Sequence, residues 1–252
     1  MSTPSAIAPA ANAPAFTTSS LRARTVDTLP QIDRPDAGLV AITEFTVGSP
    51  ERLQALLDAS ASAWTTLPWP ETLLSITWLA SLDGRKALAY VQWRDDSEFE
   101  SYGRIQRPAL AAHFKAAVPD LQPVPPVFYT RYRSGVRPDP PVPGCIVIVS
   151  IEFEGADAAR QRAWIDTVFE AIEAEPVAID GGISGHFHTS VDGTRALNYA
   201  EWTDQAAHQA ALDRSGRGTI GAGAKWQAVR DFPGVKASGF TRYRFVRRLI
   251  GG

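Results

Sequence analysis

The chain has 252 residues, 44% of them hydrophobic and 21% charged, with a formal net charge of −2. This composition is typical of a globular protein with room for two domains of roughly 100 residues each. The near-neutral charge argues against nucleic acid and membrane surfaces as partners. No apolar run approaches the ~18 residues that cross a bilayer, and one cysteine, Cys145, excludes an internal disulfide. We therefore expect a cytoplasmic protein.

Residues 1–37 are rich in Ala, Pro, Ser and Thr and lack the basic start and apolar core of a secretion signal, so we predict a disordered leader. The next segment, 38–134, begins with a strand pattern at 39–45. Ser49-Pro50-Glu51 then supplies a helix N-cap, a first-turn proline and an acidic residue. Further on, the pattern predicts strands near 74–81 and 87–93, a helix from about 96 and a strand near 127–133.

A proline-rich stretch at 135–143 can sustain neither a helix nor a central strand, which marks it as a linker between domains. Residues 144–249 then repeat the series, with a strand at 146–153 and a helix at 158–174. Each half therefore reads β-α-β-β-α-β, the order of a ferredoxin-like domain.

The two halves also resemble each other in sequence, at a spacing of roughly 110 residues, which is the length of a whole small domain. Residues 82–95 recur as 191–204, and a shorter echo relates 129–133 to 240–244. Because a ferredoxin-like unit leaves one sheet face bare, packing two such faces together explains the duplication. The predicted fold class is α+β, with two tandem ferredoxin-like domains whose antiparallel sheets pack as an α/β-barrel within one chain.

In the second half, Asp192-Gly193 favours a two-residue hairpin turn, which sets the pairing of the strands on either side. Phe187 then lies opposite Asn198, and His186 opposite Tyr199. Alternation places Phe187, Thr189, Asn198, Ala200 and Trp202 on one face and His186, His188, Leu197, Tyr199 and Glu201 on the other. We expect the second set to meet the other half of the chain.

The motif Asn198-Tyr199-Ala200-Glu201-Trp202, followed by a helix with His208, resembles the antibiotic biosynthesis monooxygenase family. The resemblance covers about 38–249 in two copies. It implies a dimeric α/β-barrel and a cofactor-free oxygenase that converts polycyclic aromatic polyketide phenols or anthrones to quinones, with dioxygen as co-substrate. It also implies an asparagine and a tryptophan in a cavity between sheet and helices, with a polar ring residue six positions after the tryptophan.

The resemblance predicts that Asn198, Trp202 and His208 are catalytic. Asn198 would hold a carbonyl or oxyanion, Trp202 would stack on the substrate, and His208 would take the phenolic proton with a pKa near neutrality. We expect further substrate contacts from Phe187, Thr189, Trp226 and Arg242. Core packing of the tryptophan and a structural role for the histidine are the alternatives.

The first half departs from the pattern, because Ala89 stands where the second half has Asn198, although Trp93 is retained. Gln92 or Trp78 would have to supply replacement contacts. We therefore expect one active site, in the second half, and a structural or degenerate first half.

Other functions remain open at this point. A cyclase or a non-catalytic aromatic-binding protein could use the same scaffold, and haem breakdown occurs on related folds. His186, His188 and Glu201 allow a two-His, one-carboxylate metal site to be drawn, but we predict no metal. Gly216-x-Gly218-x-x-Gly221 follows a helix, which indicates a loop beside the cavity and not a dinucleotide site. A small-molecule substrate is the expected partner, and a homodimer of chains stays open.

Overall fold

The computed structural model describes residues 21–252. The first half contains β2 (Leu39–Thr46), α1 (Pro50–Thr66), β3 (Leu73–Ser81), β4 (Lys86–Trp93), α2 (Phe99–Arg104), α3 (Gln106–Ala117) and β5 (Val127–Val136). The second half contains β6 (Cys145–Phe153), α4 (Ala158–Ala174), the 3-10 helix η1 (Pro176–Ile179), β7 (Gly182–Ser190), β8 (Arg195–Trp202), α5 (Gln205–Ser215), α6 (Ala224–Arg230) and β9 (Val235–Gly251). Both halves thus have the predicted order, with the second helix of each divided in two.

Local sequence explains where the long helices begin and end. The Ser49 side chain accepts a hydrogen bond from the backbone of Arg52 and caps α1 as predicted. Helix α1 ends at Thr66 because Pro68 disfavours a helical conformation for Leu67. The two long helices, α1 and α4, each bury one face against the sheet. In α1 this face is formed by Leu53, Leu56, Leu57, Ser60, Ala63 and Trp64.

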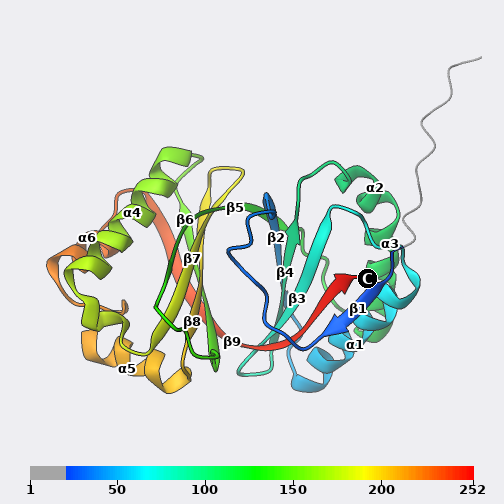
Figure 1. Ribbon diagram of the computed structural model, residues 1–252, viewed down its shortest axis with the longest axis horizontal. Helices are drawn as coiled ribbons and strands as arrows, with labels where there is room; N and C mark the ends of the chain where they lie inside the picture. The colour runs from blue at the N-terminus through cyan, green and yellow to red at the C-terminus, as the bar shows by residue number, and fades with distance from the viewer. Residues whose placement is uncertain (1–20) are drawn as a thin grey trace, which may run out of the picture.

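The strands form one antiparallel sheet that closes on itself (Figure 1). Each half has the ferredoxin-like order, β3-β4-β2-β5 in the first and β7-β8-β6-β9 in the second. β5 also pairs with β7, and the long β9 pairs with β6 through 235–243 and with β3 through 243–249. The last strand of each half therefore binds the other half, which closes a barrel within one chain and confirms the predicted fold class.

The inside of the barrel is a shared hydrophobic core that neither half could form alone. Its buried residues come from both halves: Ile32, Val40, Ile42, Leu79, Leu88, Tyr90, Tyr129, Ile146, Ile148, Leu197, Tyr199 and Tyr243. The helices cover the opposite faces of the sheet, so each half has a further core between sheet and helices (Figure 1). The predicted meeting of the Tyr199 face with the other half is confirmed.

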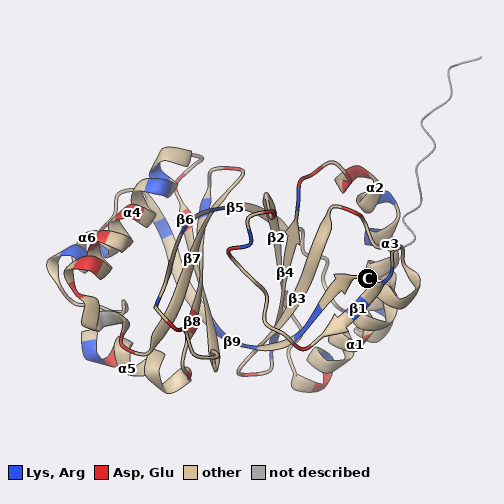
Figure 2. Cartoon of the chain, viewed as in Figure 1, with Lys and Arg blue, Asp and Glu red and all other residues tan. Residues whose placement is uncertain are grey.

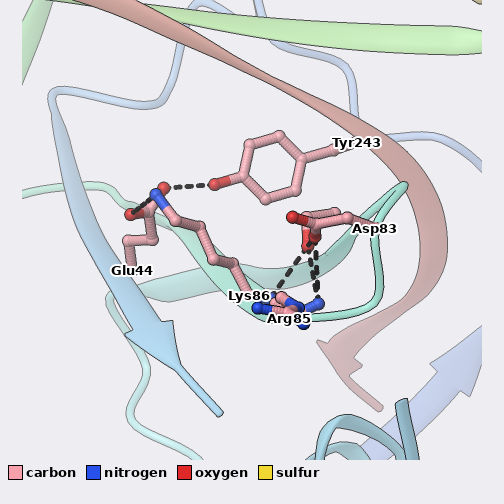
Figure 3. Close-up of polar contacts among 6 residues, drawn as sticks. Glu44, Asp83, Arg85, Lys86 and Tyr243 are labelled. Atoms are coloured by element: carbon pink, nitrogen blue, oxygen red, sulfur yellow. Dashed lines mark hydrogen bonds and ion pairs between the residues drawn. The ribbon is translucent and has the colours of Figure 1, made fainter. Parts of the chain in front are cut away.

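A polar contact on the barrel wall also joins the halves. The Tyr243 hydroxyl, on β9, donates a hydrogen bond to the Glu44 carboxylate on β2, and Lys86 Nζ lies 2.8 Å from the same carboxylate (Figure 3). Burial and the Glu44 carboxylate both raise the pKa of Tyr243, which keeps its hydroxyl protonated as a donor. The same view shows Asp83 in the hairpin turn, where its carboxylate accepts from Arg85 N at 3.0 Å.

The predicted leader, 1–37, is wrong for its described part. Residues 23–26 form strand β1 (Ala23–Val26), which pairs with the end of β9. Ile32 is 4% exposed and belongs to the barrel core, and the carbonyl of Gln31 accepts from Gln92 Nε2 at 3.0 Å. The free edge of β9 and the end of the barrel bind this segment despite its composition. Residues 1–20 lie outside the described residues.

One predicted boundary and one predicted alignment need correction. β5 continues to Val136, two residues into the predicted linker, because it pairs there with β7. The echo between 129–133 and 240–244 is not in structural register. Tyr129 pairs with Val40 and Ser190, whereas Tyr243 pairs with the equivalent Ile146 and Ser81. The structural counterpart of Tyr129 is therefore Tyr243, not Phe240.

Candidate functional site

A cavity of about 830 Å³ lies between the outer face of the second-half sheet and its helices. Its walls are mostly apolar, and they come from β6, β7, β8, β9, α4, α5 and α6, together with the end of β5 from the first half. Three exposed apolar side chains border it, those of Val136, Ile179 and Phe240. The volume and apolar lining are those of a small-molecule site, and the exposed border gives an apolar ligand an entrance.

Strand β8 brings Asn198 and Trp202 to this cavity, as alternation predicts. The predicted register is confirmed, since Asn198 pairs with Phe187 on β7 and with Val149 on β6. Asn198 Oδ1 is buried and has no hydrogen-bond partner among the described residues. Because an unpaired buried amide oxygen is costly, this atom is a natural contact for a ligand.

Helix α5 brings His208 beside Trp202. The helix is capped by Asp204, and the two rings meet edge to face with centroids 4.9 Å apart. Arg242 Nε, on β9, donates to His208 Nδ1 at 3.0 Å. Burial, with a smaller effect of the Arg242 charge, lowers the pKa of His208 to about 4.

The expected pKa near neutrality is therefore wrong for His208. Its imidazole is neutral at physiological pH, and because Nδ1 accepts from Arg242 the single ring proton lies on Nε2. The cause is tertiary, since Phe240 and Arg242 of β9 enclose the ring. His208 is thus arranged to donate a hydrogen bond and not to take a proton.

Two more expected contacts line the cavity, and two do not. Phe187 and Trp226 are part of its wall, and Trp226 Nε1 is buried without a partner among residues 21–252. Thr189 does not line the cavity, because its hydroxyl lies 3.3 Å from that of Thr130 at the junction with β5. Arg242 acts behind the wall, where it bonds His208 and Gln209 Oε1.

The cavity is electropositive, a feature that the sequence analysis did not find. Arg137, Arg217 and Arg230 line it, and no acidic residue does among the described part of the chain. Arg217 could have been suspected, because it belongs to the glycine-rich loop, which does line the cavity. Figure 2 shows both acidic and basic residues on the outer helices, whereas the charged residues that line the cavity are all basic within the described part of the chain.

Hydrogen bonds hold the glycine-rich loop and the residues that follow it. Glu175 Oε2 accepts from the backbone of Gly223 at 2.9 Å, and Arg230 donates to Thr219 Oγ1 at 2.8 Å. Gly221 admits no side chain, because a Cβ atom there would lie 2.0 Å from Trp226 Nε1. The loop therefore fixes the position of Trp226 in the wall.

The two histidines on the inner face form no metal site. His188 Nε2 lies 2.9 Å from the Tyr90 hydroxyl, and His186 Nδ1 lies 3.0 Å from Ser134 Oγ. Burial lowers the pKa of His186 to about 4 and that of His188 to about 3. Within residues 21–252 no group of three or more His, Cys, Asp or Glu side chains is placed to hold a metal ion.

A second cavity, of about 670 Å³, occupies the equivalent place in the first half. Trp93 lines it, but the expected replacements for Asn198 do not. Gln92 points into the barrel and bonds Ser75, whereas Trp78 donates to Ser60 Oγ at 2.9 Å within the core.

The architecture defines a class of protein, the tandem ferredoxin-like barrel with a cavity between sheet and helices. No family model matches the chain, and no curated protein matches it in sequence. None of the helices in the described residues is long and apolar enough to span a membrane.

Comparison with solved structures shows the fold. An anthrone oxidase-like protein superposes with a TM-score of 0.63 at 15% identity, over 85% of this chain and 93% of its own. A candidate monooxygenase from Fusobacterium nucleatum superposes with a TM-score of 0.51 at 10% identity, over 86% and 96%. The chain thus shares the fold of these two proteins over both of its halves.

Proposed function

We propose that the protein is a cofactor-independent monooxygenase that oxidises a polycyclic aromatic phenol or anthrone to a quinone. In the anthrone case one atom of dioxygen becomes the new carbonyl oxygen and the other leaves as water. The substrate supplies all the electrons, and its two methylene hydrogens leave in the water. An electron-rich anion can reduce dioxygen itself, so the protein's task is to bind the anion and exclude bulk water.

The observation that carries this proposal is the chemistry of the cavity wall. It combines a large apolar surface with three arginines and no acidic side chain among the described residues. Such a wall favours a flat apolar molecule that is negatively charged, because the apolar surface takes the rings and the arginine side chains attract the anion. A phenolate or anthrone enolate has this combination of properties.

The polar groups have distinct roles in this proposal. The Asn198 amide donates to the reacting oxyanion through Nδ2, and Oδ1, which has no partner among the described residues, accepts from a hydroxyl group of the substrate. His208 donates its Nε2 proton to the same anion, and Arg242 holds that tautomer. Among the described residues that line the cavity there is no carboxylate, and His208 is neutral with a lowered pKa. The substrate proton therefore passes to water at the cavity entrance before bulk water is excluded, and the hydrogen-bond donors favour ionisation by lowering the substrate's pKa.

Oxygen uptake by the metal-stripped protein tests the function, with a panel of anthrones and hydroxynaphthacenes and with quinone absorbance followed in parallel. We expect uptake matched to quinone, and an Asn198→Ala variant slowed by about 100-fold, the usual effect of one lost oxyanion contact. Thr43→Ala is the matched control, because Thr43 lines only the first-half cavity. Cyclised product without oxygen uptake would indicate a cyclase, and binding without conversion a ligand-binding protein. Full turnover by Asn198→Ala would refute the role of this amide.

A further inference from the structure

The first-half cavity has the geometry of the active-site candidate but a different chemistry. The pairing of β2 with β4 places Trp93 as the counterpart of Trp202 and Ala89 as the counterpart of Asn198. Phe99 follows Trp93 at the spacing at which His208 follows Trp202, and it meets Trp93 edge to face with centroids 4.7 Å apart. The first half therefore repeats the edge-to-face ring pair of the second half, with a phenyl ring in place of the imidazole.

The arginine behind the imidazole is replaced as well. Arg242 pairs with Val147 on β6, and the equivalent pair in the first half is Phe128 with Ala41. The Phe99 and Phe128 rings lie 5.0 Å apart, in the place of the histidine–arginine hydrogen bond. Two phenylalanines therefore stand where the second half has a histidine and an arginine. This cavity keeps the tryptophan but lacks the polar groups that are proposed to stabilise the substrate anion.

New polar groups appear elsewhere in the same cavity. Tyr102 meets Trp93 edge to face at 5.1 Å and lines the cavity, and Thr43 lies directly opposite Ala89. Burial raises the pKa of Tyr102 to about 12, so its hydroxyl stays protonated and can donate.

The charge at the rim is positive. Helix α3 places Arg107 and Lys115 at the cavity, and neither forms a salt bridge within the described residues. Asp120 also borders it, but this carboxylate is bound by Arg52. Two unpaired cations thus face an aromatic-walled space large enough for a small polycycle.

We propose that the first-half cavity is a second ligand site, which binds a planar aromatic molecule with an anionic group and does not oxidise it. The rings of Trp93, Phe99 and Phe128 take the aromatic body, the Tyr102 hydroxyl bonds a polar substituent, and Arg107 with Lys115 binds the anion. This site is independent of the proposed oxygenase activity, because ligand binding in the first half does not require substrate turnover in the second half.

Calorimetric titration with 1-hydroxy-2-naphthoate tests this proposal, with neutral 1-naphthol as the comparison ligand. We expect two naphthoate molecules per wild-type chain and one for Ala41→Phe, which fills the first-half cavity from the buried strand β2. Ala200→Phe fills the other cavity and is the matched variant, which should retain the first-half site. Circular dichroism establishes that each variant is folded.

Arg107→Gln provides a test that leaves the cavity volume almost unchanged. It should weaken naphthoate binding to the first-half site about fivefold, as expected for one exposed charge interaction, and leave naphthol binding unchanged. Arg217→Gln, at the other cavity, is its control. Unchanged stoichiometry in Ala41→Phe together with unchanged naphthoate affinity in Arg107→Gln would overturn the proposal. Because the readout is binding, failure of the oxygenase assay would not affect it.

Discussion

Replacing Arg242 with methionine tests how the neutral His208 is held in its tautomer. Arg242 Nε donates to His208 Nδ1 at 3.0 Å, and this bond leaves the ring proton on Nε2. A hydrogen bond from a charged donor contributes about 1.5–3 kcal/mol, so its loss should lower kcat roughly 10- to 100-fold. The pKa of His208 should rise, because the nearby positive charge is removed, while burial still keeps it below 6.5.

Nitrogen-15 NMR of the histidine rings, combined with the pH dependence of turnover, provides the assay. In the wild type we expect His208 to titrate near pH 4 with Nδ1 unprotonated, and turnover to show no inflection from this group between pH 5 and 8. Arg247→Met is the matched control, because Arg247 lies on the same strand and bonds Asp58 away from the cavity.

Two results would refute the reasoning. A wild-type His208 that titrates near pH 6.5 would show that the ring is not held neutral by burial. An Arg242→Met variant with wild-type kcat and an unchanged His208 spectrum would show that the guanidinium does not set the tautomer.

Three further outcomes are expected. Gly221→Ala should displace Trp226, since the added Cβ lies 2.0 Å from its Nε1, and weaken aromatic binding in fluorescence titration while the fold is retained; unchanged affinity would contradict the loop's role. Tyr243→Phe should lower the free energy of unfolding in urea by about 1–3 kcal/mol, because the Glu44 carboxylate loses a donor; an unchanged midpoint would show the contact to be unimportant. The buried histidines should make the fold acid-sensitive. In the unfolded chain these histidines are protonated below about pH 6.5, whereas in the folded chain they are protonated only near pH 4 or, for His188, near pH 3. The free energy of unfolding should therefore fall as the pH decreases through this window, by up to about 1.4 kcal/mol per pH unit for each group. A free energy of unfolding that does not change with pH in this range would contradict the burial of the histidines.

Much of the fold could be predicted because its determinants are local. The Asp192-Gly193 turn sets the β7–β8 register, and alternation then assigns Asn198 and Trp202 to the helix side. The sequence repeat predicted the duplication. The uncovered faces of the two ferredoxin-like sheets predicted that these sheets pack against each other.

What the sequence did not show depends on contacts between distant segments. The pKa of His208 is set by burial and by Arg242 on β9, at the other end of the half. Strand β1 forms because β9 offers a free edge, which composition does not indicate. The sequence did not indicate a ligand site in the first half, because the polar residues of that cavity, Thr43 and Tyr102, have no counterpart in the Asn198 motif.

The central claim is that the second-half cavity promotes direct reaction of an aromatic anion with dioxygen. Turnover of an anthrone under ¹⁸O₂ by metal-stripped protein tests it most directly, with mass spectrometry of the quinone and Asn198→Ala as the comparison. We expect one labelled oxygen in each quinone molecule, formed at a rate that depends on Asn198. Quinone labelled only from water, or no reaction faster than that of the anthrone alone, would contradict it.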